Sequence, residues 1–194
     1  MRQLQVKNFV LALLFVCAAA VPSMADAITY SGSTAPANTP TFRRPVETGD
    51  AFAVDDQGNL VITRYNSFNF IVSAGGVYNF TSTQNFDGFL ILYSNSFNPT
   101  NSLTNFVIGD DDLVDFVPGQ SGFSVTLSSN LAYFLVTTGF DDASFGNFTN
   151  MIVGPGVITA VPEPATLMLL GTGLAGAAAA RRKRRHAAAA PRQS

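Results

Sequence analysis

Aspartate is the residue type in this chain with the clearest capacity for chemistry. Four aspartates lie close together in one expected turn: Asp110, Asp111, Asp112 and Asp115. Calcium binds carboxylate and carbonyl oxygens from loops, so this cluster is the candidate metal site. It is not an EF-hand, because Asp115 occupies the sixth position, where that loop requires glycine, and the glutamate at position twelve is missing. The pattern leaves open whether the cluster binds calcium or is a solvated turn that keeps the domain soluble.

Further carboxylates could join this cluster or act on their own. Asp87 and the neighbouring pair Asp141 and Asp142 could approach the aspartate cluster if the ends of their strands meet. Two carboxylates can also act as acid and base in glycoside hydrolysis. Glu47 is the single glutamate of residues 26–160, and we expect it to lie in a loose segment. The carboxylates therefore do not predict an enzyme.

Other catalytic side chains do not occur in the middle of the chain. Residues 26–160 contain no Cys, His, Lys or Trp, which removes the usual nucleophiles, most general bases and the ligands that zinc prefers. Three arginines stand against twelve acidic residues there, a net charge of −9, although the whole chain carries −2. This acidic balance argues against nucleic-acid binding, which requires a basic surface.

The elements that must position these aspartates are β-strands. Alternating apolar and polar residues, separated by turn clusters, predict about eight or nine strands over residues 46–160. The apolar run at 89–93 is typical of a strand buried on both faces, and residues 67–72 and 77–82 are expected to pair as a hairpin. The spacing predicts one all-β domain, a β-sandwich of jelly-roll type. Residues 26–45, rich in Ser, Thr, Pro, Ala and Asn, are expected to form a loose N-terminal segment.

The first 25 residues have the pattern of a secretory signal peptide. Two basic residues precede an apolar run at 9–20 that is too short for a permanent membrane helix. Small residues then allow signal peptidase to cut between Ala25 and Asp26, and a cut after Ala27 is the alternative. The pattern predicts an N-terminal signal helix and export through the Sec machinery. A domain exported without cysteine folds without disulfides.

The C-terminal end has three parts in a fixed order. Pro162, Glu163 and Pro164 form a stiff, extended segment that neither a helix nor a strand continues. Residues 165–180 carry no charge, and as a transmembrane helix they would extend about 24 Å, slightly less than a hydrocarbon core. A basic cluster that favours the cytoplasmic side follows. Its members are Arg181, Arg182, Lys183, Arg184 and Arg185.

This order resembles the PEP-CTERM sorting signal of Gram-negative bacteria. The resemblance covers residues 161–185 and includes Gly171 and Gly173 in the Leu-rich run. It implies cleavage near Pro-Glu-Pro by an exosortase, a membrane transpeptidase, and a transient anchor in the inner membrane. It also implies a place at the cell surface or in the extracellular matrix, because the family accompanies loci for extracellular polysaccharide and biofilm. Residues 186–194 are expected to be a disordered tail, and a permanent C-terminal anchor is the alternative.

The middle of the chain resembles the bacterial pre-peptidase C-terminal β-sandwich. The likeness lies in residues 86–93, in the aspartate turn at 109–112, and in the strands at 122–127 and 133–140. Such modules are non-catalytic and accompany secreted and surface proteins, and some bind calcium or polysaccharide. We therefore expect an exported structural or adhesive protein. The alternatives are a calcium-dependent carbohydrate-binding module and, third, a carboxylate-based hydrolase.

Overall fold

The fold is all β in the part of the chain that the computed structural model describes, which is residues 25–113, 119–162 and 172. Ten strands form two sheets, and every neighbouring pair of strands is antiparallel. No helix in these ranges is long and apolar enough to cross a membrane. The predicted signal helix, transmembrane helix and C-terminal tail lie outside the described residues, so they remain predictions.

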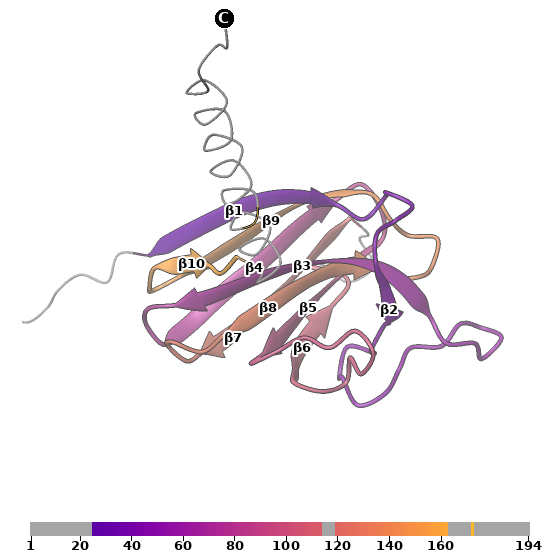
Figure 1. The fold of residues 1–194 in the computed structure, drawn as a ribbon, viewed down its shortest axis with the longest axis horizontal. Helices are drawn as coiled ribbons and strands as arrows, with labels where there is room; N and C mark the ends of the chain where they lie inside the picture. Colours follow the sequence, from indigo (N-terminus) through magenta and orange to yellow (C-terminus); the bar gives the residue numbers. More distant parts are fainter. Residues whose placement is uncertain (1–24, 114–118, 163–171, 173–194) are drawn as a thin grey trace, which may run out of the picture.

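The strand order is that of a jelly roll, in which Greek keys wrap into two packed sheets (Figure 1). The first sheet has, in spatial order, β1 (Asp26–Ser33), β9 (Asn147–Gly154), β4 (Gly76–Gln84) and β7 (Gln120–Leu127). The second sheet has β10 (Ile158–Ala160), β3 (Ile62–Val72), β8 (Tyr133–Gly139), β5 (Gly88–Ser94) and β6 (Phe106–Asp110), and β2 (Thr41–Arg43) pairs with the start of β3. The prediction of an all-β, two-sheet domain is confirmed, with ten strands instead of eight or nine.

The N-terminal part of the domain is ordered by strand pairing. β1 pairs with β9 along eight residues, from Asp26 opposite Gly154 to Ser33 opposite Asn147. The prediction of a loose segment over residues 26–45 is therefore wrong. Small polar residues dominate this part of the sequence, and they hid a strand whose few large side chains alternate toward the core.

The expected hairpin between the runs at 67–72 and 77–82 is also wrong. The first run belongs to β3 and the second to β4, and these strands lie in different sheets. Their aromatic residues face each other across the core, with the ring centroids of Phe70 and Phe80 6.1 Å apart. Alternation shows that each strand has one buried face, but it does not distinguish strands that pair from strands that pack face to face.

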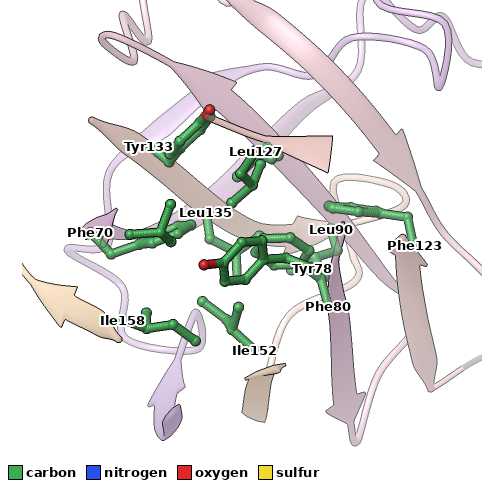
Figure 2. Close-up of a cluster of buried hydrophobic side chains, with 12 residues drawn as sticks. Phe70, Tyr78, Phe80, Leu90, Phe123, Leu127, Tyr133, Leu135, Ile152 and Ile158 are labelled. Atoms are coloured by element: carbon green, nitrogen blue, oxygen red, sulfur yellow. The ribbon is translucent and has the colours of Figure 1, made fainter. Parts of the chain in front are cut away.

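The main core lies between the two sheets (Figure 2). Both sheets contribute to it, and the members drawn and labelled are Phe70, Tyr78, Phe80, Leu90, Phe123, Leu127, Tyr133, Leu135, Ile152 and Ile158. A second apolar cluster contains Phe42, Phe89, Ile91, Tyr93 and Val136. Because the side chains of β5 alternate between the two clusters, the run at 89–93 is fully buried. The prediction of a strand buried on both faces is confirmed.

Candidate functional site

Acidic residues from three loops meet at one end of the sandwich. Asp87 directly precedes β5, Asp110 ends β6, and Asp141 follows β8. β5 lies between β8 and β6, with Gly88 opposite Gly139. The backbone amide of Phe140, the first residue after β8, also donates a 3.0 Å hydrogen bond to the carbonyl of Asp87. The predicted approach of Asp87 and Asp141 to the aspartate cluster therefore follows from the order of these strands.

A buried arginine, which the sequence did not single out, lies among these carboxylates. Arg44 is 5% exposed, and its guanidinium lies 4.4 Å from the ring centroid of Phe89 and 4.8 Å from that of Phe140. Its Nη1 donates a 3.0 Å hydrogen bond to the carbonyl of Pro45, whereas its Nε has no hydrogen-bond partner. Burial lowers the pKa of Arg44, and four carboxylates counteract this shift. They belong to Asp111, Glu47, Asp141 and Asp87.

The backbone around Arg44 explains how this side chain is held. The amide of Arg44 donates to the carbonyl of Val61 at 3.1 Å, and the carbonyl of Arg44 accepts from the amide of Ala53 at 2.9 Å. The segment between β2 and β3 thus folds back on itself at this end of the sandwich. The composition shows that three arginines are the basic residues available to twelve acidic ones in residues 26–160, but it does not indicate which arginine is buried.

Glu47 belongs to this site, although the sequence analysis placed it in a loose segment. Burial raises the pKa of Glu47, and a side-chain hydrogen bond with Asp111 and the charge of that residue raise it further. The carboxylates of Glu47 and Asp111 are therefore neighbours at this end of the sandwich.

A neighbouring strand contacts the aspartate cluster through Ser121 of β7. The hydroxyl of Ser121 donates a 2.6 Å hydrogen bond to the carbonyl of Asp111, and Oδ1 of Asp112 is buried without a hydrogen-bond partner. Asp115 lies outside the described residues. Within residues 25–113, 119–162 and 172, no three His, Cys, Asp or Glu side chains form a group that could hold a metal ion. Calcium binding at these four aspartates remains a prediction.

The carboxylate of Asp87 makes the stability of the fold depend on pH. Burial raises the pKa of Asp87, the charges of Asp112, Asp111 and Asp141 raise it further, and Arg44 lowers it. Because this pKa is higher in the folded state than in the unfolded state, ionised Asp87 destabilises the fold. The destabilisation is present above the raised pKa and is relieved as the pH falls through it.

We expect Asp87→Asn to raise the melting temperature of the mature protein at pH 7, because the amide carries no charge to repel. The increase should be smaller at pH 4 than at pH 7, because the wild-type carboxyl becomes protonated as the pH falls through its raised pKa. Thermal unfolding at the two pH values measures this, with the exposed Asp142→Asn as the matched control. An equal rise for both variants, or a fall for Asp87→Asn at pH 7, would contradict the prediction.

A cavity of about 440 Å³ opens beside Arg44. Its polar lining comes from Arg44, Glu47 and Thr48, and its apolar lining from Val46, Phe52, Ala53, Val54, Phe89 and Phe140. The ring of Phe140 is 39% exposed. This cavity is open to solvent and combines aromatic and aliphatic side chains with three polar ones.

The sorting segment begins directly where the sandwich ends. After β10, the amide of Val161 still donates a 2.8 Å hydrogen bond to the carbonyl of Asn69 in β3. Pro162, the first residue of Pro-Glu-Pro, is the next residue and is exposed. The other members of the predicted sorting motif lie outside the described residues: Glu163, Pro164, Gly171, Gly173, Arg181, Arg182, Lys183, Arg184 and Arg185.

A family model matches this C-terminal end. Residues 160–185 match the PEP-CTERM protein-sorting motif. The motif fits an exported protein that an exosortase processes, and it implies a transient C-terminal membrane anchor. The match is limited to this segment, and the resemblance of the middle of the chain to the pre-peptidase C-terminal module is not confirmed.

Comparisons of the whole chain add no functional assignment. No curated protein matches it. Among solved structures, it is similar to the cowpea mosaic virus top component, with 15% identity over 75% of this chain and 95% of that chain and a TM-score of 0.29. It is also similar to the VP2 subviral particle of infectious bursal disease virus, with 14% identity over 69% and 35% of the two chains and a TM-score of 0.29. TM-scores this low support no conclusion about function.

Proposed function

We propose that the protein is a component of the cell surface or extracellular matrix of a Gram-negative bacterium, with a structural or adhesive β-sandwich that catalyses no reaction. The observation that supports this role is the position of the sorting motif, whose Pro162 follows the last paired residue of the sandwich. Cleavage near that residue leaves the folded domain whole. Its partners during delivery are the Sec machinery, signal peptidase and exosortase, and extracellular polysaccharide is its partner afterwards.

The test is processing in cells that contain an exosortase. We expect the precursor to be shortened near Pro162 when the exosortase is active and to remain full-length at its C-terminus when the exosortase is inactivated. Replacing Pro162, Glu163 and Pro164 with alanine should abolish the shortening, because the rigid recognition segment is lost. Intact-mass measurement of the product gives the answer, with Pro191→Ala as the matched control. Equal shortening of both variants would contradict the proposal.

The structure also supports one of the two signal peptidase cuts. Oδ2 of Asp26 accepts a 2.9 Å hydrogen bond from the amide of Ile158, and Asp26 is the first paired residue of β1. A cut after Ala27 would remove both features, whereas a cut after Ala25 keeps them. We therefore expect N-terminal sequencing of the mature protein to begin at Asp26. A mature N-terminus at Ile28 would contradict this expectation.

The cavity beside Arg44 favours an adhesive role in which the domain binds carbohydrate. An exposed ring such as Phe140 can stack on the apolar face of a sugar, and neighbouring side chains such as Glu47 and Thr48 can bind its hydroxyl groups. Several carboxylates around one arginine repel anionic glycans, so the preferred ligand is a neutral sugar.

A glycan array with the mature protein tests this second role. Phe140→Ala should weaken binding of a neutral glycan about tenfold, the equivalent of roughly 1.4 kcal/mol of ring contact. Phe145→Ala is the matched control, because Phe145 is also 39% exposed but does not line the cavity. Binding of no glycan, or equal losses in the two variants, would leave the passive structural role as the better proposal.

A further inference from the structure

The starts of the first and last strands, which lead to the two processing sites, lie side by side. The carboxylate of Asp26, at the start of β1, is hydrogen-bonded to the amide of Ile158, at the start of β10. Figure 1 shows β10 beside the start of β1, at one end of the domain. Val161 follows Ile158 by three residues, about 10 Å along an extended chain. The segment before Asp26 therefore starts at one corner of the molecule, and the segment after Val161 starts about 10 Å from that corner, beside Asn69 of β3.

This terminal corner is uncharged at its surface. A shallow hollow of about 480 Å³ marks it, and its lining is Ala25, Gly75, Gly76, Val77, Asn79, Val153, Gly154 and Pro155. Val77, which lines the hollow, is 58% exposed, and Val157, two residues after the lining residue Pro155, is 59% exposed. Of the described residues at this corner, Asp26 alone carries a charge, and its carboxylate is bonded to Ile158.

The charged residues lie at the far end of the same strands. β3 starts far from the corner, where Arg64 lies opposite Thr41, and it ends at the corner, where Val72 lies opposite Ile158. β8 runs antiparallel to β3, so Asp141, which follows β8, belongs to the far end. The acidic residues around Arg44 share that end. The domain thus has an uncharged corner, where β1 and β10 start, and an acidic end opposite.

We propose that, in the precursor, the terminal corner lies against the lipid surface of the inner membrane and the acidic end points away from it. The inference rests on the proposed function, because it requires the C-terminal membrane segment, which is kept until exosortase acts, to be attached. That segment starts about 10 Å from the corner, so it keeps the corner close to the bilayer. Exposed valines fit the interface between headgroups and acyl chains, and the acidic end is repelled by anionic lipids.

Labelling of single cysteines in the precursor that keeps its C-terminal segment tests this orientation. Cys17, the single cysteine of the chain, is replaced by alanine, and one cysteine is introduced by Val157→Cys or Val77→Cys at the corner. Val54→Cys at the far end is the matched control, because Val54 is 58% exposed, compared with 59% for Val157 and 58% for Val77. The probe is a membrane-impermeant maleimide, added to spheroplasts without exosortase. Each rate is divided by the rate of the same variant unfolded in detergent.

We expect both corner cysteines to react about tenfold more slowly than cysteine at position 54, because an interfacial position excludes the aqueous reagent. Two corner positions keep the test decisive if one variant fails to fold. Equal normalised rates at the corner and at the far end would overturn the proposal. The measurement requires no cleavage, so its failure is distinguishable from a failure of exosortase processing, which the product mass reports separately.

Discussion

Replacement of Arg44 with methionine is expected to lower the free energy of unfolding of the mature protein by about 1–2 kcal/mol, because the cation–π contacts and the hydrogen bond to Pro45 are lost while the cost of burying the charge is removed. Methionine has a similar length but removes the positive charge between the rings of Phe89 and Phe140. The nearby carboxylates then face one another without a buried counter-charge. Urea denaturation at pH 7 measures the loss.

The neighbouring arginine supplies the control for this experiment. Arg43 is exposed, and its guanidinium lies 6.0 Å from the ring centroid of Phe52. Arg43→Met should change the free energy of unfolding by about 0.5 kcal/mol or less. The Arg44→Met variant should also regain stability as the pH falls, since protonation removes the repulsion between the carboxyl groups. Equal losses in the two variants would show that the position of Arg44 among the carboxylates has no energetic effect.

The second large effect is expected from Phe80→Ala in the core. Phe80 is 1% exposed, and its ring centroid lies 5.2 Å from that of Phe123 in the same sheet and 6.1 Å from that of Phe70 in the facing sheet. Figure 2 shows Phe80 among the other core side chains, so removal of its ring leaves a cavity between the two sheets. We expect the free energy of unfolding to fall by about 3–5 kcal/mol.

Val77→Ala provides the comparison for the core variant, because it lies on the same strand but is 58% exposed. Its expected effect is about 0.5 kcal/mol or less. The domain contains no cysteine after residue 17, so no disulfide compensates for the lost packing. A loss below about 1 kcal/mol for Phe80→Ala would mean that the two sheets do not pack through this ring.

The fold class could be predicted because strand periodicity is a local property. The run at 89–93 is apolar at every position and is buried on both faces, as expected. The neighbours of each strand depend on long-range pairing, which periodicity does not contain. For this reason, β3 and β4 were expected to pair, although they lie in facing sheets. β1 was missed because five of its eight residues are Ser, Thr, Ala or Gly.

The candidate site could be predicted only in part. The acidic turns identified Asp87, Asp141 and the cluster that starts at Asp110, and the strand order brings these loops to one end. Arg44 and Glu47 were missed as members, because they lie in the irregular segment between β2 and β3, where no pattern indicates which side chain turns inward. Their roles arise from tertiary contacts, namely two aromatic rings and a carboxyl neighbour.

The unequal pairing of the first and last strands has a mechanical consequence. β10 pairs with β3 through three residue pairs, whereas β1 pairs with β9 through eight. Tension applied to the C-terminal end of the domain therefore acts first on β10, which peels away while the two main sheets remain paired. The three released residues add about 10 Å of slack. A domain attached at that end would absorb a small pull by extending its last strand before any force reached the core.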